Sequence, residues 1–204
     1  MTPVSAGKTV VIGQIGITVL DNFISDAQVN DLLNLYADKV MEDSTVCTKD
    51  GVGEKIDSRT GLRRWVSHNE TPELYGLCIK IADFVGKNLD NAENVQLLSY
   101  SKGQKYEPHF DAFDKSKSDW THYGKGGQRV YTVMGYLNDL YDGGETSFPT
   151  LGIDIKPRRG RLLVWSNVGE DYSVPHPDSL HGGMPVGEGE KKCFTIWFRE
   201  NNYK

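Results

Sequence analysis

Two residues that could bind a metal ion stand two positions apart in the segment Tyr106–Asp111. They are His109 and Asp111. Side chains two apart in an extended strand point to the same face, so this segment would aim an imidazole and a carboxylate into one small volume. Such a pair can hold one edge of a divalent metal ion. A His-x-Asp pair alone is a weak signal, because the ion needs a third ligand from elsewhere in the chain.

His181 is the best candidate for that third ligand. It precedes Gly182 and Gly183, and glycines allow the backbone to approach a bound group closely. The other histidines are expected to be structural or surface residues: His68, His122 and His176. Two histidines and one carboxylate that leave coordination positions open form the facial triad of non-haem Fe(II) oxygenases.

Composition restricts the classes of protein that the chain could represent. A length of 204 residues predicts a single domain, residues 1–204. The net charge of −5 and the pI near 5.5 lack the basic footprint of a nucleic-acid-binding protein, so no nucleic-acid partner is expected. The three cysteines are scattered and predict reduced thiols. With no apolar membrane span or signal peptide in the sequence, we expect a cytoplasmic protein and no membrane partner.

The first half of the chain predicts helices that support a later β-rich part. Residues 9–12 and 15–20 are rich in β-branched side chains and predict short strands. Ser25 with Gln28 forms a capping box for a first helix, and Thr71 with Pro72 begins a second. One face of the first helix is expected to be buried through residues at helical spacing: Val29, Leu32, Leu33, Tyr36 and Val40. Residues 42–63 between the helices predict a lid loop or a surface insertion.

From Val95 onward the pattern changes to short strands separated by turn residues. The predicted strands are residues 95–101, 106–111, 129–138, 145–148, 152–155, 160–166, 181–186 and 192–199. About eight short strands after a helical start is the strand count of a jelly roll.

Several motifs in this β-rich part resemble the prolyl 4-hydroxylase family of Fe(II)/2-oxoglutarate dioxygenases. The resemblance covers roughly residues 95–200, with a looser match upstream at Arg59-Thr60 and Trp65. The matching stretches are Tyr-Glu-Pro-His-Phe-Asp (106–111), the run from Gly126 to Asp139, Gly-Gly-Glu-Thr-Ser-Phe-Pro (143–149), Lys-Pro-Arg-Arg-Gly (156–160), Leu-His-Gly-Gly-Met-Pro-Val (180–186), and Lys191 with Trp197.

The resemblance implies a fold that is mostly β with N-terminal helices (α+β). Its core would be a double-stranded β-helix, or jelly roll, with helices packed on one sheet. Residues 1–94 would then supply the helical support and the lid loop, and residues 95–200 the core. The implied cofactors and cosubstrates are Fe(II), 2-oxoglutarate, O2 and ascorbate.

The resemblance also assigns roles to single residues. His109, Asp111 and His181 match the catalytic iron ligands. Lys191 and Tyr100 match residues that bind the distal carboxylate of 2-oxoglutarate, although Tyr100 could instead be a core tyrosine. Thr146 and Trp197 match residues that line the cosubstrate pocket. Arg129 matches a residue that meets the peptide substrate, although a structural salt bridge is an equal alternative.

One pattern in the last strand supports the pocket independently of the resemblance. Lys191 and Trp197 are an even number of positions apart, so they share a face of an extended strand. A lysine on that face could neutralise an anion held in a tight barrel. The sequence therefore places a cation and an aromatic ring in one predicted pocket.

The predicted reaction is 4-hydroxylation of prolyl residues in a peptide or protein, with release of succinate and CO2. Trp120, Tyr123, Tyr141 and Arg129 could line a groove for an extended proline-rich peptide, over which loops 42–63 and 112–127 would close. Alternatives are hydroxylation of free proline or another small molecule, oxidative nucleic-acid demethylation, and a non-catalytic jelly-roll module with a structural metal. A structural site would usually have a fourth protein ligand, and the sequence offers no obvious one. The chain is expected to be a monomer or homodimer.

Overall fold

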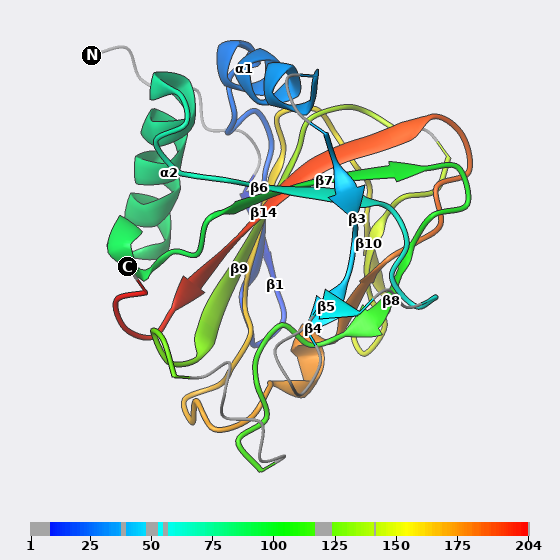
Figure 1. Cartoon of the computed structure of the whole chain (residues 1–204). Coiled ribbons are helices and arrows are strands. Elements are labelled where there is room, and N and C mark those ends of the chain that lie inside the picture. The colour runs from blue at the N-terminus through cyan, green and yellow to red at the C-terminus, as the bar shows by residue number, and fades with distance from the viewer. Residues whose placement is uncertain are drawn as a thin grey trace.

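Two antiparallel β-sheets form the frame of the protein (Figure 1). The computed structural model describes residues 9–37, 40–47, 53–54, 57–116, 124–140 and 142–203. The large sheet has eight strands in the order β1 (Thr9–Ile12), β2 (Ile17–Leu20), β12 (Leu162–Ser166), β9 (Arg129–Tyr136), β14 (Glu190–Arg199), β7 (Val95–Ser101), β6 (Leu62–Val66) and β3 (Glu42–Asp43). The small sheet has the order β11 (Ile153–Ile155), β10 (Thr146–Phe148), β13 (His181–Gly183) and β8 (Tyr106–His109).

Each of the eight segments predicted as strands after residue 95 contains a strand, from β7 to β14. Five of them end at the predicted residue, and β8, β9 and β13 end two or three residues earlier. The strand predicted over 106–111 ends at His109, so Asp111 lies in a bend just after β8 rather than within it. The two candidate ligands therefore do not share one strand, and another feature must bring Asp111 to the site.

Two α-helices lie on one face of the large sheet, on the side opposite β10 and β8 (Figure 1). Helix α1 spans Asp26–Ala37, and the predicted capping box at its start is present, with Gln28 N bonded to Ser25 Oγ at 3.3 Å. Helix α2 spans Pro72–Val85 and is capped by Thr71, whose Oγ1 accepts from Leu74 N at 3.1 Å. Short 3-10 helices occupy Leu89–Asn91 (η1) and Pro177–Ser179 (η3).

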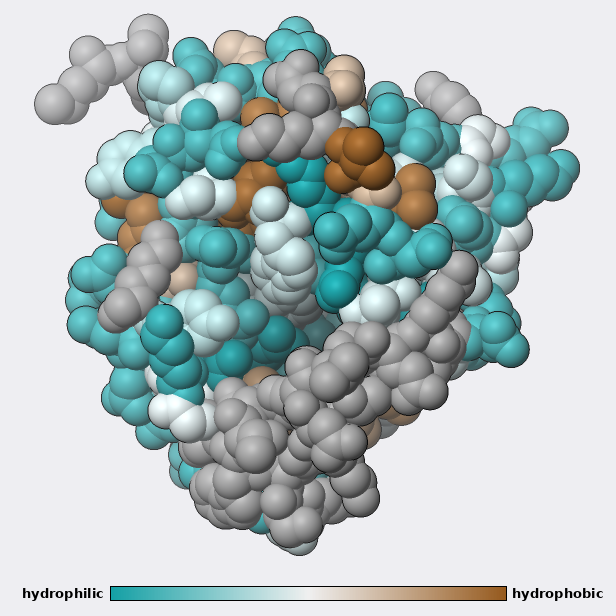
Figure 2. Space-filling model, in the orientation of Figure 1, coloured by the Kyte–Doolittle hydropathy of each residue, from teal (hydrophilic) through white to brown (hydrophobic). Residues whose placement is uncertain are grey.

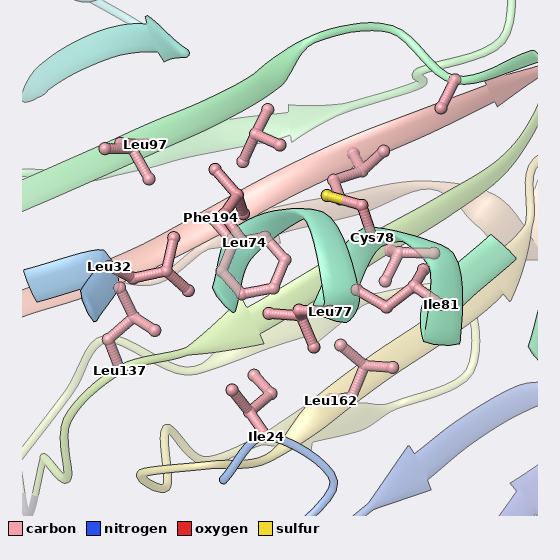
Figure 3. Packing of buried hydrophobic residues seen from close by; sticks show 14 of the residues in the cluster. Ile24, Leu32, Leu74, Leu77, Cys78, Ile81, Leu97, Leu137, Leu162 and Phe194 are labelled. Carbon is pink, nitrogen blue, oxygen red and sulfur yellow. The ribbon is translucent and has the colours of Figure 1, made fainter. Parts of the chain in front are cut away.

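Strict alternation along the central strands gives the large sheet two buried faces. On β14, Phe194, Ile196 and Phe198 pack beneath the helices, whereas Cys193 faces the small sheet. Figure 3 shows the helix side, where Leu74, Leu77 and Ile81 of α2 meet Leu162 and Phe194 of the sheet. Alternate residues on β14 that face the small sheet are therefore directed toward the space between the two sheets, as the spacing of Lys191 and Trp197 predicts.

The part before residue 95 contributes more to the sheet than predicted. Strand β6 was not expected, because Leu62-Arg63-Arg64-Trp65-Val66 is interrupted by two arginines. Four strands of the large sheet, β1, β2, β3 and β6, come from this part of the chain. The sheet therefore runs across the expected boundary at residue 94, and the segment before it is not simply a helical support.

The segment 42–63 is also less loop-like than expected. It contains β3, which pairs with β6, and a hairpin of β4 (Val46–Cys47) and β5 (Gly53–Glu54). Residues 48–52 and 55–56 of this predicted lid, and 117–123 of the other, lie outside the described residues. Val40 was expected on the buried face of α1, but the helix ends at Ala37 and Val40 is 87% exposed.

Three further features of the described residues concern the surface, the length of the helices and the cysteines. The face shown in Figure 2 is mainly hydrophilic, with hydrophobic residues gathered in its upper part. Within the described residues, both helices are too short or too polar to cross a bilayer. Cys78 and Cys193 are buried, and within the described residues neither forms a disulfide, so the expectation of three reduced cysteines stays a prediction.

Candidate active site

The pairing of β13 with the edge strand β8 brings the two candidate histidines together. In the antiparallel register of β8 and β13, His109 lies directly opposite His181, and their ring centroids are 4.4 Å apart. The strands approach closely at the next position, because a Cβ on Gly182 would lie 2.9 Å from the carbonyl oxygen of Tyr106. A Cβ does not fit that contact, so Gly182 is required for the pairing of the two strands, whereas the predicted approach of the glycines to a bound group stays a prediction.

Asp111 joins the two histidines although it lies beyond the end of β8. Its Oδ1 is 3.6 Å from His109 Nε2 and its Oδ2 is 3.4 Å from His181 Nε2. One ligand atom from each of the three residues lies within 4.8 Å of the others, and this is the one such cluster of histidine, cysteine and acidic side chains in the described part of the chain. The structure thus assembles the three predicted ligands.

Backbone hydrogen bonds fix how both imidazoles are presented. His109 Nδ1 lies 2.9 Å from the carbonyl oxygen of Glu107, and His181 Nδ1 lies 2.8 Å from that of Ser179. Because a carbonyl only accepts, each Nδ1 carries the proton and each Nε2 offers a lone pair toward Asp111. Metal-ligating histidines are commonly held in this way by their second nitrogen.

The protonation states suit a metal site. Burial lowers the pKa of His181 to about 4, despite the opposing attraction of Asp111, so the imidazole is neutral at neutral pH. Burial acts to raise the pKa of Asp111, but in acid the protonated forms of His181 and His109, together with Arg129, outweigh it and hold that pKa well below its usual value. A neutral imidazole and an ionised carboxylate are the forms that bind metal.

Lys191 lies in a hollow of about 520 Å³ that the triad also lines. It is directly opposite Tyr100 in the register of β14 and β7, which explains why the two predicted cosubstrate residues are neighbours. Its Nζ is 5.8 Å from the ring centroid of Tyr100 and 5.5 Å from that of Tyr136. We call this space the inner hollow.

Among the residues that the structure describes, no carboxylate balances the charge of Lys191. The residue is 3% exposed, and within the described residues no carboxylate forms an ion pair with it. Burial therefore lowers its pKa, against the weaker attraction of Cys193 and Glu145. A buried cation that lacks an anion is costly, so its presence indicates that an anionic ligand belongs there.

The other predicted pocket residues line the same inner hollow. Thr146 is buried on β10, and its Oγ1 accepts a hydrogen bond from the Tyr136 hydroxyl at 2.6 Å. Trp197 is buried on β14, and its indole nitrogen has no hydrogen-bond partner among the described residues. Tyr100 contributes its ring to the wall, and burial raises the pKa of its hydroxyl, which stays protonated and able to donate.

A second hollow, of about 1040 Å³, adjoins the first and shares six lining residues with it: Arg59, Gln96, Tyr106, His109, Asp111 and Trp197. We call it the outer hollow. Its further lining includes aromatic and cationic residues: Trp65, Phe110, Phe113, Arg63 and Arg129. The rings of Trp65 and Trp197 are 5.9 Å apart along one wall. Of the predicted substrate residues, Arg129 lies here, whereas Trp120, Tyr123 and Tyr141 fall outside the described residues.

Arg129 is already engaged within the protein. Its Nε and Nη2 bind the two carboxylate oxygens of Glu93 at 2.6 and 2.9 Å, and its guanidinium lies 4.1 Å from the ring centroid of Trp197. Glu93 also accepts from Arg199 Nε at 2.7 Å. The structure thus contains the salt bridge that the sequence allowed as an alternative, and a substrate contact of Arg129 stays a prediction.

Three residues of the site were not predicted from the sequence. Arg59, noted upstream without a role, is buried between the two hollows, where it donates to Thr45 O and Gln96 Oε1. Tyr136 lines the inner hollow beside Lys191. Thr132, on β9, donates its hydroxyl to Asp111 Oδ2 at 2.7 Å. The signal for Tyr136 and Thr132 was their alternation along β9, which places both on the side of the small sheet.

These residues fit the groups that the sequence implies. The Nε2 atoms of two histidines and one carboxylate form a donor set for Fe(II) that leaves coordination positions open. The unpaired Lys191 in the adjoining hollow fits a ligand with a free carboxylate, as 2-oxoglutarate has.

Comparison with known families agrees with this geometry. The profile of the 2OG-Fe(II) oxygenase superfamily matches residues 95–199. That range begins with β7, ends with β14 and includes all three members of the triad. The chain therefore belongs to the 2OG-Fe(II) oxygenase superfamily.

Individual relatives narrow the class further. The chain is 31% identical to prolyl 4-hydroxylase 2 of Arabidopsis thaliana, over 91% of this chain and 67% of the relative. It is 34% identical to a putative prolyl 4-hydroxylase of Acanthamoeba polyphaga mimivirus, over 91% and 74%. A crystal structure of the viral collagen prolyl hydroxylase of Paramecium bursaria Chlorella virus-1, in its 2OG complex, superposes with a TM-score of 0.71 at 29% identity and covers 92% of this chain and 97% of that one. Within the superfamily, the chain belongs to the prolyl 4-hydroxylases.

Proposed function

We propose that the protein is an Fe(II)- and 2-oxoglutarate-dependent dioxygenase that 4-hydroxylates prolyl residues of a peptide or protein, with release of succinate and CO2. The observation that carries the proposal is the His109–Asp111–His181 triad beside a hollow that holds the unpaired Lys191. We also infer that the two sheets are those of a double-stranded β-helix, because the site lies between them.

Each residue has a defined part in this proposal. His109, Asp111 and His181 would hold Fe(II), which together with 2-oxoglutarate and O2 supplies the oxidising power for C–H hydroxylation. The ammonium of Lys191 and the hydroxyl of Tyr100 would bind the distal carboxylate of 2-oxoglutarate. Thr146 and Trp197 would close the walls of the inner hollow and exclude water from it.

The outer hollow supports a peptide as the substrate. It adjoins His109 and Asp111, and aromatic side chains line it. Aromatic-lined grooves bind proline-rich segments, which adopt the extended polyproline II conformation without help. The names of the relatives, including a collagen prolyl hydroxylase, favour peptidyl proline over the free amino acid.

Mass spectrometry tests the proposal directly. Proline-rich and collagen-like peptides would be incubated with the protein, Fe(II), 2-oxoglutarate and ascorbate, and the products sequenced by fragmentation. We expect one added oxygen atom on proline and an equal yield of succinate. Oxygen gain on free proline alone would favour the small-molecule alternative, and succinate release without any oxidised peptide would contradict a peptidyl-proline substrate.

Two histidine variants form a matched pair for the site. His109→Ala removes a proposed ligand and should abolish both succinate and hydroxyproline formation. His176→Asn removes an imidazole outside the triad but keeps a side-chain acceptor for the start of η3, and it should retain activity. Turnover of His109→Ala at the rate of the unmodified protein would exclude the proposed metal centre.

Three further features stay predictions. Ascorbate is expected to sustain turnover in the assay, and omission of it should reduce product per enzyme. A monomer or homodimer is expected by light scattering. A cytoplasmic location is expected from fractionation of the source cells.

A further inference from the structure

A buried polar residue, Asn167, is linked by hydrogen bonds to two of the candidate ligands, through one intermediate residue in each case. It follows β12 and is fully buried, as is Ser179, while Thr132 is 1% exposed. The side chain of Asn167 contacts Thr132, which contacts Asp111. Its backbone contacts Ser179, which contacts His181. Two separate arms thus join one residue to two members of the triad.

The side-chain arm is directional. Thr132 Oγ1 lies 2.7 Å from Asp111 Oδ2, 2.8 Å from Asn167 Nδ2 and 3.0 Å from Asn167 Oδ1. The hydroxyl has a single proton, and the ionised carboxylate is its strongest acceptor. The proton therefore points to Asp111, and Asn167 Nδ2 donates to the lone pair of Thr132. The amide thereby holds the hydroxyl in the orientation that serves Asp111.

The backbone arm fixes the segment that leads to His181. The carbonyl oxygen of Asn167 accepts from His176 N at 2.9 Å and from Ser179 Oγ at 3.1 Å. Ser179 in turn offers its own carbonyl oxygen to His181 Nδ1 at 2.8 Å. Substitution of the Asn167 side chain leaves this arm in place, so the two arms can be tested separately.

We propose that Asn167 is a positioning residue, which acts through Thr132 to fix the carboxylate of Asp111 so that Oδ2 is occupied by the hydroxyl and Oδ1 is left available to the metal ion. The inference rests on the proposed function, because it assumes that the triad binds a metal. Asp111 needs such support, since it lies beyond the end of β8 and is not held by a strand pair. Partners of metal ligands in this position typically change metal affinity about 10–100-fold when removed.

The test uses Co(II), whose visible spectrum reports coordination in the absence of turnover. Thr132→Val keeps the shape but removes the donor, and we expect Co(II) affinity to fall about 10–100-fold with altered visible bands. Thr132→Ser keeps the donor and should restore both. Thr18→Val, on β2, removes a strand hydroxyl that bonds Gly16 O far from the triad and should change neither.

Asn167→Ala tests the amide itself. We expect a smaller loss of Co(II) affinity than in Thr132→Val, with the same spectral change. Because Asn167 acts through Thr132, the double variant should bind no more weakly than Thr132→Val alone. Additive losses, or losses without a spectral change, would show a merely structural role and overturn the inference. If Thr132→Val does not fold, Asn167→Ala alone gives the affinity and spectral readouts, and Thr132→Ser, which keeps the donor, should match the unmodified protein.

Failure of the inference and of the proposed function are distinguishable. If the unmodified protein and Thr132→Val bind Co(II) equally with the same spectrum, the positioning role is wrong while the metal centre stands. If the unmodified protein binds no Co(II) and His109→Ala changes nothing, the metal centre is wrong and the positioning role falls with it.

Discussion

Strand β14 carries a buried cation near each end, and the two differ in whether the protein supplies an ion-pair partner. At one end, Arg199 binds Glu93, which also binds Arg129, so the charges are paired and hydrogen-bonded within the protein. At the other end, Lys191 is equally buried but has no ion-pair partner among the described residues. The closed cluster is complete without a ligand, whereas the open one is not.

The difference separates a structural role from a binding role. A buried charge with its partners in place supports the folded structure. Removal of one partner leaves the others buried without compensation, which strongly destabilises the protein. A buried charge without partners lowers the stability of the ligand-free protein and regains that free energy when an anion binds. The two ends of β14 can therefore be distinguished by whether a substitution changes stability or ligand affinity.

The largest expected effect is on the closed cluster. Glu93→Gln leaves Arg129 and Arg199 without their carboxylate, and we expect a loss of about 3–5 kcal/mol in the free energy of unfolding. For a chain of this size that corresponds to a decrease in Tm of roughly 6–20 °C. Calorimetry measures it, and Glu73→Gln, at an exposed site in the first turn of α2, is the control that should change little. A stable Glu93→Gln with weakened 2-oxoglutarate binding would reverse the assignment of roles.

The open cation gives the next largest effect, but on binding. Lys191→Met should weaken 2-oxoglutarate binding about 10–150-fold, the value of a charge-assisted contact of about 1.5–3 kcal/mol. It should also raise the Tm of the ligand-free protein, because it removes an unpaired buried charge. Anaerobic titration calorimetry and thermal melting measure the two. Lys192→Met is the matched control: Lys192 points to the other face and pairs with Glu190 at 3.2 Å, so binding should not change.

A smaller effect separates the two roles considered for Arg129. Arg129→Lys keeps the charge but loses the two-point contact with Glu93, and we expect about 1 kcal/mol of lost stability. Because the guanidinium is already engaged, the KM for a proline peptide should change little. A raised peptide KM with unchanged Tm would instead support the predicted substrate contact.

The smallest effect is a pH dependence. It concerns the difference in Tm between Lys191→Met and the unmodified protein. Burial lowers the pKa of Lys191 in the folded state, while the unfolded value is about 10.4. Between these values the unfolded chain binds the extra proton, so the stability of the unmodified protein rises with pH. The Tm advantage of Lys191→Met should therefore be largest at neutral pH and diminish toward pH ~10. A constant difference across that range would show that the ammonium is not desolvated. 

Residues placed by strand periodicity were the predictable part of the site. The alternation of β14 predicted that Lys191 and Trp197 face one way, and both line the inner hollow. The strands from β7 to β14 were located for the same reason. Such information is local, since it depends on residues a few positions apart.

Contacts that depend on the register between strands could not be predicted. Thr132 and Asn167 are ordinary polar residues in the sequence, and their link to Asp111 exists because β9 pairs with β12 in the large sheet while the bend after β8 brings Asp111 to Thr132. Glu93 is 36 residues from Arg129, and no pattern in the sequence near either residue predicts their pairing. Strand β6 was missed because its arginines face a helix carbonyl on one side and the outer hollow on the other.

The tryptophan pair in the wall of the outer hollow allows ligand binding to be followed by the intrinsic fluorescence of the protein. Trp65 is 40% exposed there, whereas its neighbour Trp197 and the more distant Trp165 are buried. Indole emission shifts to shorter wavelength when water is displaced, so a peptide that fills the hollow would change the Trp65 signal. Occupancy of the hollow could then be followed without turnover or label, and Trp65→Phe would remove the part of the change that comes from Trp65.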